Sequence, residues 1–294
     1  MKCPICERAE LAPTGPYAHC AACDYWRSDL PHDVASTAAP DEEYDLVSYE
    51  HTRRANYESI LELLGPARGR LLEIGCADGL FLELAGARGY DVLGIEPNAK
   101  MTAGNKHRQD IRAGFFPAVL AGAPARFDVI ALNCVFEHVP DVAAMIDDFK
   151  RHLAPGGRVM INVPVTSGLM FKAARALYAL GAHYPFDRLW QKGFVSPHLH
   201  YFATGNLERL FAAHGMALVA ERELALFSLG GMYARLSLDP NIRAAQRFAA
   251  LGALYAYYPI SRIAPDARAY VFTADPAGSS ASTRRARDLP ADPD

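Results

Sequence analysis

The feature that most constrains this chain is a short apolar run, followed by a glycine-rich turn and apolar residues at helical spacing. Residues 71–74 read LLEI, residues 75–79 read GCADG, and apolar residues then recur from Leu80 to Ala85. A short continuous apolar run is typical of a strand buried on both faces, and the later spacing is typical of a helix. Because a strand, a glycine turn and a helix start let a ligand lie against bare backbone, the pattern predicts a ligand site in an α/β fold.

A second apolar run, residues 92–95, ends in an acidic side chain. Glu96 follows Gly75 by 21 residues, and an acidic residue at the tip of the second strand can accept hydrogen bonds from both hydroxyls of a ribose. We therefore expect an adenosine-type cofactor. A dinucleotide fingerprint would need glycine at positions 77 and 80. The chain has Ala77 and Leu80 there, which disfavours a nicotinamide oxidoreductase.

An acidic residue stands two positions before the first glycine of the turn. The segment EIGCADG (73–79) resembles the E/D-x-G-x-G-x-G motif of class I S-adenosylmethionine-dependent methyltransferases, with Ala77 in place of the middle glycine. The block FDVIALNCVFEHVPD (127–141) resembles the fourth-strand motif of small-molecule methyltransferases of the ubiquinone-biosynthesis type. LAPGG (153–157) resembles the turn before the fifth strand of these proteins. The motifs keep the family's order over roughly residues 70–164.

This resemblance implies a fold, a cofactor and a set of contacts. The fold is α/β, a Rossmann-like doubly wound sheet of seven strands with a small N-terminal zinc ribbon. The implied cofactor is S-adenosyl-L-methionine, and the implied activity is methyl transfer. A place for Phe115 in the hydrophobic core is an equal alternative to a cofactor contact. The implied cofactor-binding residues are Glu73, Gly75, Cys76, Gly79, Glu96, Pro97, Gly114, Phe115 and Asn133.

Two C-x-x-C pairs lie near the N-terminus. Cys3 and Cys6 form the first pair and Cys20 and Cys23 the second, with 13 residues between the pairs. Each pair can present two thiolates from a tight turn, and two such pairs supply a tetrahedral four-cysteine site for Zn²⁺. A module this small buries little core, so the metal would have to hold it together. Two disulfides or four unligated thiols are the alternatives.

The pattern divides the chain into a zinc ribbon (1–28), a linker (29–45), a methyltransferase domain (46–275) and a disordered tail (276–294). Residues 165–203 exceed what a plain crossover needs, and we predict that this insertion covers the acceptor and sets specificity. Its large apolar side chains could line an acceptor pocket, pack as core, or rest on a membrane surface beside a lipid-linked substrate. These side chains are Leu169, Phe171, Leu177, Tyr178, Phe186, Leu189, Trp190 and Phe194.

Three histidines lie where the loops at strand ends should gather. Methyl transfer from a sulfonium is an in-line displacement that mainly requires positioning. A hydroxyl acceptor must also lose its proton, and a neutral histidine can take that proton near pH 7. We therefore predict His138, His198 and His200 as catalytic candidates. A loop-orienting role for His138 and structural roles for the other two are the alternatives.

Composition and charge bear on nucleic-acid binding, secretion and membrane spanning. The chain has 294 residues, 51% of them hydrophobic, and a formal net charge of −3, which is ordinary for a soluble globular protein and argues against a broad nucleic-acid surface. Residues 1–6 lack the apolar core of a signal peptide, and no apolar run approaches the about 18 residues of a membrane span. We expect a cytoplasmic protein that can still touch a membrane surface; the sequence predicts no oligomeric state.

The sequence therefore favours a methyltransferase that acts on a small-molecule acceptor, such as a sugar, a glycan precursor or another biosynthetic intermediate. The expected chemistry is O-methylation. An N-terminal ribbon before this fold is similar to that of deoxysugar methyltransferases. One alternative is an RNA methyltransferase that binds RNA through its ribbon. The other is a non-catalytic S-adenosylmethionine-binding protein.

Overall fold

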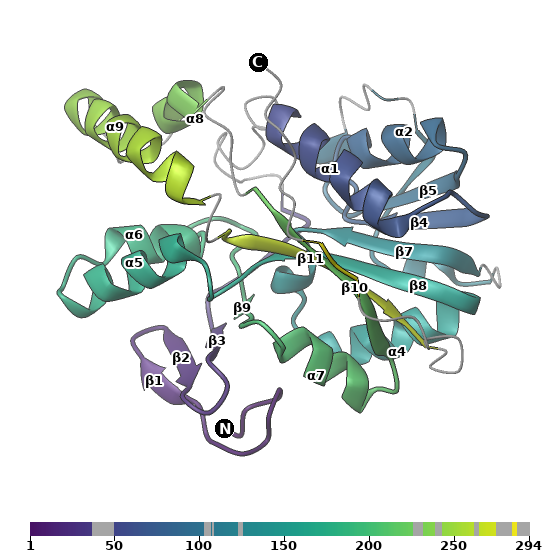
Figure 1. Ribbon diagram of the computed structural model, residues 1–294, viewed down its shortest axis with the longest axis horizontal. Coiled ribbons are helices and arrows are strands. Elements are labelled where there is room, and N and C mark those ends of the chain that lie inside the picture. The colour runs from purple at the N-terminus through teal and green to yellow at the C-terminus, as the bar shows by residue number, and fades with distance from the viewer. Residues whose placement is uncertain are drawn as a thin grey trace.

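The centre of the molecule is an eight-stranded sheet with the strand order β12-β10-β11-β8-β7-β4-β5-β6 (Figure 1). The computed structural model describes residues 1–36, 50–102, 107, 109–122, 126–225, 232–238, 243–261, 265–274 and 284–286. The strands are β4 (Arg70–Ile74), β5 (Asp91–Glu96), β6 (Ile111–Ala113), β7 (Phe127–Asn133), β8 (Leu153–Pro164), β10 (Ala217–Leu224), β11 (Ala267–Thr273) and β12 (Arg284–Ala286). Neighbouring strands are parallel, except that β11 runs antiparallel to β8 and β10. This mixed, doubly wound sheet confirms the predicted fold class and adds one short strand to the seven expected.

The added strand, β12, falls within the predicted disordered tail, 276–294. It pairs in parallel with β10, where Arg284 lies opposite Ala220. Residues 275–283 and 287–294 lie outside the described residues. The predicted linker, 29–45, is described only as far as residue 36.

Helices cover both faces of the sheet (Figure 1). Alternate residues of β7 show why: Val129 and Ala131 pack in the core under one helix layer, whereas Ile130 and Leu132 pack under the other. Because both faces are buried, the strands read as continuous apolar runs. The layers are α1 (Glu50–Leu64) and α2 (Leu80–Ala87) on one face, and α4 (Val142–His152) and α7 (Asn206–Ala213) on the other.

The LAPGG segment is not a turn ahead of the fifth strand but part of that strand. Phe127 and Val129 of β7 pair with Leu153 and Arg158 of β8, so a two-residue step on one strand faces a five-residue step on the other. The extra residues form a bulge in which Gly156 has a φ of +72°, a conformation that glycine adopts without strain. The bulge lets the chain pass from α4 directly into the sheet.

The N-terminal ribbon forms a second sheet that includes a strand of the insertion. β1 (Ala12–Thr14), β2 (Tyr17–Cys20) and β3 (Tyr25–Ser28) are antiparallel, and β9 (His200–Tyr201) adds to the edge of β3. Backbone hydrogen bonds therefore join residues at the start of the chain to residues 200–201. The ribbon is continuous in sequence but not separate in structure.

The ribbon also packs on both of its sides. Cys3 and Tyr25 belong to the same hydrophobic cluster as Phe136 and Phe202 beside the large sheet. Trp26, on the other side, packs with α5 (Leu169–Ala179) and α6 (Tyr184–Leu189) of the insertion. In Figure 1 the ribbon strands lie directly below these two helices. The ribbon thus fills the space between the main sheet and the insertion.

Two more helices, α8 (Met232–Leu238) and α9 (Ala244–Ser261), lie beyond the same end of the sheet as α5 and α6, at the left of Figure 1. The short α3 (Ala99–Thr102) follows β5. Among the described helices, none has the length and apolar composition needed to cross a bilayer.

Candidate functional site

The glycine turn lies between β4 and α2, at the carboxyl end of β4. Gly75 has a φ of +71°, and a Cβ at this position would come within 2.5 Å of a methyl carbon of Val135. Gly79 precedes α2 with a φ of +87°. Ala77 also has a left-handed φ, +48°, which a residue with a Cβ adopts only at some cost. The backbone therefore keeps the turn conformation even where alanine replaces the middle glycine.

Glu96 ends β5 and faces this turn. Its Oε2 accepts a hydrogen bond from the backbone N–H of Ala77 at 3.0 Å, and its Oε1 accepts one from that of Asn98 at 2.9 Å. The side chain is buried, which raises the pKa of the carboxyl against the opposing effect of the two donors. Glu96 lines the cavity described below. Because each carboxylate oxygen can accept a further hydrogen bond, it can bind a pair of hydroxyls.

The other predicted cofactor residues fall into two groups. Pro97, Gly114, Phe115 and Asn133 line the same cavity as Gly75 and Glu96. Glu73, Cys76 and Gly79 are not among the described residues that line it.

Two of these residues support the turn from behind. Cys76 is 2% exposed, and its sulfur lies against Gly94. Glu73 accepts a hydrogen bond from Nδ2 of Asn133 at 2.9 Å, and burial raises the pKa of its carboxyl to about 8. Its Oε2 has no hydrogen-bond partner within the described structure. Glu73 and Cys76 thus support the turn from outside the cavity.

Arg53 of α1 faces the turn. Arg53 donates to both carboxylate oxygens of Asp78, at 2.5 and 3.3 Å, and lies over the ring of Tyr57. Although burial acts to raise it, the guanidinium holds the pKa of Asp78 below its usual range. Arg53 also lines the cavity, where it presents a cation. The local sequence does not distinguish it from its neighbour Arg54.

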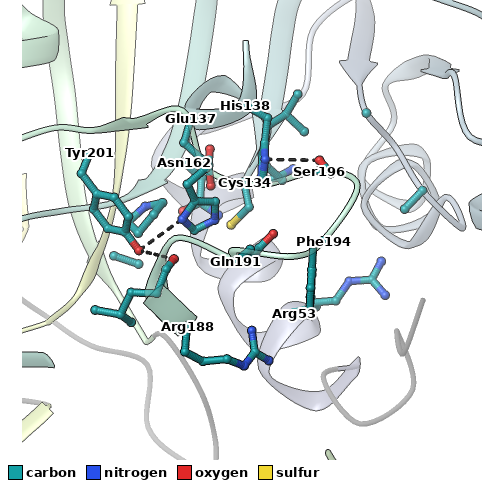
Figure 2. A pocket seen from close by; sticks show the side chains of 18 of the residues that line it. Arg53, Cys134, Glu137, His138, Asn162, Arg188, Gln191, Phe194, Ser196 and Tyr201 are labelled. Carbon is teal, nitrogen blue, oxygen red and sulfur yellow. Dashed lines mark hydrogen bonds between the residues drawn. The ribbon is translucent and has the colours of Figure 1, made fainter. Parts of the chain in front are cut away.

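A continuous cavity of about 1140 Å³ extends from the glycine turn to the insertion. Figure 2 shows part of its lining, from Arg53 of α1 to Phe194 and Tyr201 of the insertion. Sites for one drug-sized ligand are typically about 300–1000 Å³, so the cavity has room for a cofactor and an acceptor. The insertion forms its far wall. Its large apolar side chains divide between two of the predicted roles: some line the cavity and others form the core against the ribbon. The wall includes Leu169, Leu177, Leu189 and Phe194, and the core includes Phe171, Phe186 and Trp190.

Three titratable side chains of the cavity wall lie close together, and Figure 2 labels two of them, Glu137 and His138. Glu137 and His138 belong to a single 3₁₀ turn, η3 (Phe136–His138), that follows β7, and His198 comes from the insertion. One donor atom of each side chain lies within 4.8 Å of one from each of the others. All three line the cavity. The fold therefore brings two of the predicted histidines together.

Hydrogen bonds fix which nitrogen of each histidine carries the proton. Nδ1 of His138 lies 2.9 Å from the carbonyl oxygen of Pro197, which can only accept, so Nδ1 is protonated and Nε2 keeps its lone pair. The Tyr201 hydroxyl donates to the Leu189 carbonyl and therefore accepts from Nδ1 of His198 at 3.2 Å. Burial lowers the pKa of His138 to about 4 and that of His198 well below its usual value. Both rings are neutral bases.

Glu137 is the residue of this group that the sequence analysis leaves out, although its E-H motif contains it. The side chain is 1% exposed, and neither carboxyl oxygen has a partner in the described part of the chain. Burial raises the pKa of the carboxyl to about 8. An unpartnered buried carboxyl is costly and is a sign of a functional group. With two imidazoles it also forms a donor set that divalent transition metals accept.

His200 lies outside this group. Its Nε2 donates to the carbonyl of Val139 at 2.8 Å, so its Nδ1 accepts from the Tyr25 hydroxyl at 2.5 Å. It is buried and is not among the described residues that line the cavity. His200 is the first residue of β9 and so belongs to the sheet shared with the ribbon, whereas His198 precedes the strand. We therefore leave His200 out of the catalytic group proposed below.

The four N-terminal cysteines gather at one point of the ribbon. Sγ atoms are 3.6 Å apart for Cys3 and Cys23 and 3.6 Å apart for Cys6 and Cys20, and all four lie within 4.8 Å of one another. A tetrahedral site with Zn–S bonds of about 2.3 Å has S–S edges of about 3.8 Å, whereas a disulfide would need about 2.05 Å. The four are free thiols, and their arrangement fits Zn²⁺.

Comparison with known proteins places the sheet and the cavity in one family. A family model described as "Methyltransferase domain" matches residues 48–221, more than half of the chain. The chain belongs to this family. The matched range contains the glycine turn, Glu96 and the Glu137–His138–His198 group, whereas the ribbon lies before it.

Several relatives carry more specific names. "Ubiquinone biosynthesis O-methyltransferase" from Psychrobacter arcticus is 33% identical over 125 residues, which are 40% of this chain and 46% of that protein. The protein of the same name from a Caulobacter species is 30% identical over 161 residues, 50% of this chain and 62% of that protein. "C-methyltransferase NovU" from Streptomyces niveus is 28% identical over 177 residues, 58% of this chain and 38% of that protein. In each case the chain spans less than two thirds of the relative.

Solved structures share the fold at low sequence identity. One comes from the complex between the Haloferax volcanii Trm112 methyltransferase activator and a methyltransferase, with a TM-score of 0.52 and 13% identity over 81% of this chain and 99% of that chain. Another is magnesium protoporphyrin IX methyltransferase from Synechocystis with bound SAH, with a TM-score of 0.50 and 11% identity over 78% of this chain and 86% of that chain. These likenesses confirm a class I methyltransferase fold.

Proposed function

We propose that this protein transfers a methyl group from S-adenosyl-L-methionine to an oxygen of a small-molecule acceptor. The observation that carries the proposal is the cavity that joins Glu96 and the glycine turn to the Glu137–His138–His198 group. O-methylation needs a methyl donor and a proton acceptor on opposite sides of one site. The names of the relatives that are 30–33% identical support the same chemistry.

The residues on one side of the cavity fit this cofactor. Glu96 would bind the ribose hydroxyls, and Arg53 would bind the carboxylate of the methionine part. Phe115, which is 53% exposed and lines the cavity, would stack on adenine. The missing Cβ of Gly75 lets Val135, which also lines the cavity, pack against the turn. When bound, the cofactor supplies a methyl group already activated by a sulfonium.

The residues on the other side would take the proton of the acceptor. In this proposal Nε2 of His138 accepts the proton while the Pro197 carbonyl holds Nδ1, and the Glu137 carboxylate stabilises the imidazolium that forms. His198 orients the hydroxyl. Because the pKa of Glu137 is about 8, its ionised fraction grows as the pH rises through 8. The rate of methyl transfer should therefore rise over the same range.

A divalent cation bound by the same three side chains is a second way to activate a hydroxyl, because a metal lowers its pKa. The donor set supports this alternative. Treatment with EDTA distinguishes the two. The histidine-base mechanism requires activity to survive when the ribbon keeps its zinc, and loss of activity under that condition would favour the cation.

We further propose that Cys3, Cys6, Cys20 and Cys23 hold one structural Zn²⁺, and that the protein works in the cytoplasm. The S–S spacing supports the first statement, and free thiols, which reducing compartments preserve, support the second. Contact with a membrane surface is supported by Leu177 and Leu180, which are 43% and 83% exposed at the end of α5. A net charge of −3 and the apolar wall of the insertion favour a small molecule over RNA.

The test starts with the purified protein. Mass spectrometry identifies co-bound small molecules, and calorimetry measures the affinity for S-adenosylhomocysteine. The protein is then incubated with methyl-labelled cofactor and three acceptor sets: phenols with apolar tails, sugar nucleotides and total RNA. We expect label in small molecules, and loss of that label in the Glu137→Gln variant. Label confined to RNA would favour the RNA enzyme, and cofactor binding without any transfer would favour the non-catalytic protein.

A further inference from the structure

Strand β3 of the ribbon is hydrogen-bonded directly to the segment that carries His198. Ser28 donates its side-chain hydroxyl to the His198 carbonyl at 2.7 Å, and its backbone N–H donates to the Leu199 carbonyl at 3.0 Å. Arg27 and Trp26 lie opposite His200 and Tyr201 in the antiparallel pairing of β3 with β9. The backbone from the His198 carbonyl to Tyr201 is thus fixed by the ribbon.

A second connection runs from the ribbon to the loop of Glu137 and His138. The Tyr25 hydroxyl donates to Nδ1 of His200, and Nε2 of His200 donates to the carbonyl of Val139, the residue after His138. The backbone N–H of Leu199 donates to the carbonyl of Glu137 at 2.8 Å. The two strand-end segments that carry the catalytic group are therefore tied to each other and to Tyr25.

The metal-binding turn lies immediately before this part of the ribbon. The backbone N–H groups of Cys23 and Asp24 both donate to the carbonyl of Cys20, at 3.3 and 2.8 Å, and Tyr25 begins β3. Tyr25 is fully buried and Ser28 is 2% exposed. Metal ligation by Cys20 and Cys23 would therefore fix the position from which β3 starts.

We infer that the ribbon is a positioning module for the catalytic group: the four-cysteine site fixes β3, and Tyr25 and Ser28 hold the segments of Val139 and His198 at their mutual distance. The catalytic role of these segments rests on the function proposed above. Their positioning by the ribbon does not, and it can be measured without an acceptor. Tyr25 and Ser28 act through His200 and the backbone, so they are positioning residues.

The variant Tyr25→Phe tests the inference. It keeps a ring to pack near Phe202, whose centroid is 5.8 Å away, and removes the donor to His200. We expect the backbone amides of residues 134–142 and 196–202 to exchange hydrogen about 2–10-fold faster than in the wild type, which corresponds to the loss of one hydrogen bond. Affinity for S-adenosylhomocysteine should stay within about twofold.

Tyr17→Phe is the matched control. It removes a buried tyrosine hydroxyl from the same ribbon, but that hydroxyl donates to Asp187 of α6 at 2.6 Å and not to the catalytic segments. Its exchange should rise in residues 184–192 and stay unchanged in 134–142. If Tyr25→Phe leaves exchange in 134–142 unchanged, or if both variants raise it equally, the inference is overturned.

Tryptophan emission shows whether the ribbon stays in place. The chain has two tryptophans, and Trp26 and Trp190 both lie buried between the ribbon and the insertion. An unshifted emission maximum means that Tyr25→Phe leaves the ribbon docked. If the emission maximum of Tyr25→Phe shifts to the red, the exchange experiment is repeated with Ser28→Ala in place of that variant. Faster exchange in residues 196–202 then supports the inference, and unchanged exchange overturns it.

Methyl transfer separates this inference from the proposed function. For Tyr25→Phe we expect kcat to fall several-fold while KM for the cofactor is unchanged. If the wild type transfers no methyl group to any acceptor, the proposed function fails, but the exchange data still decide whether the ribbon positions the two segments.

Discussion

Glu96 supports the cofactor site from two directions with one carboxylate. It accepts hydrogen bonds from the backbone N–H of Ala77, which has a left-handed φ, and from the N–H of Asn98. Glu96 also lines the cavity. The side chain therefore holds the glycine turn in shape, and in the proposed function it would also accept the hydroxyls of the ribose.

Replacement of Glu96 should weaken cofactor binding while the fold persists. Charge-assisted hydrogen bonds contribute about 1.5–3 kcal/mol each when buried. For Glu96→Ala we therefore expect at least an about tenfold weaker dissociation constant for S-adenosylhomocysteine in calorimetry. Glu58→Ala, an exposed change on α1, is the control. An unchanged constant for Glu96→Ala would remove Glu96 from the site.

Glu137 should lower the stability of the protein as the pH rises. Its native pKa is about 8 against an ordinary 4.5, so the native state holds a proton that the unfolded chain has lost between these pH values. The stability from this group is complete below about pH 4.5 and is lost as the pH rises through 8.

Glu137→Gln removes that titration. The variant should match the wild type at pH 5 and exceed it at pH 8.5 by on the order of 2 kcal/mol, or about 5 °C in Tm. Scanning calorimetry at the two pH values measures the difference, with Glu58→Gln as the control. Equal Tm values at pH 8.5 would show that Glu137 already has a partner for its charge.

At the level of single residues, the sequence predicts what depends on local backbone geometry. Gly75 directly follows β4, and Glu96 ends the adjacent parallel strand β5, so their meeting follows from the order of the motifs. The role of Arg53 does not follow, because its pairing with Asp78 depends on how α1 packs across 25 residues of chain. The partner that holds His200 away from the cavity, Tyr25, lies 175 residues away in the sequence, so no local pattern separates His200 from His198.

At the level of elements, periodicity gives the apolar face of a helix but not its partner. The apolar side chains of α5 are recognisable in the sequence, yet the surface that covers Phe171 is the ribbon, through Trp26 at a ring distance of 5.9 Å. The contact between Tyr17 and Asp187 spans 170 residues. No local pattern encodes such a pairing.

The insertion should be separable from cofactor binding. Replacing residues 168–194 with a short Gly/Ser linker leaves Gly75 and Glu96 intact, so affinity for S-adenosylhomocysteine should stay within about threefold. Methyl transfer should fall, because the far wall of the cavity is gone. Trp26, then the one tryptophan left, loses Phe171 and Phe186, and its emission should shift to the red. Loss of cofactor binding would mean that the insertion is part of the core.

At the level of the whole molecule, the ribbon and the methyltransferase sheet share one hydrophobic core. Cys3, Cys20 and Tyr25 pack in the same cluster as Ile161 and Phe211. On its other side the ribbon packs with α5 and α6. An element that is buried on both sides cannot unfold without exposing its neighbours, so the ribbon and the sheet should melt together.

Removal of the metal tests this cooperativity. We expect one equivalent of zinc in protein purified without added metal, and its loss in Cys6→Ser. Because the ribbon core is continuous with the sheet, Cys6→Ser should lower the Tm of the single calorimetric transition by several degrees rather than abolish a small separate one. Cys134→Ser, which changes a cysteine outside the cluster, should keep the zinc.

Outcomes of the zinc and Tm measurements that differ from these expectations also have a definite meaning. Full zinc in Cys6→Ser would place the metal elsewhere, and a second equivalent that Glu137→Gln removes would place a cation in the cavity. If Cys6→Ser loses its zinc and its main transition stays at the Tm of the wild type, the ribbon folds independently of the sheet. The sheet would then keep its full stability without the metal, so the metal would not be what fixes β3 and the hydrogen bonds from Tyr25 and Ser28.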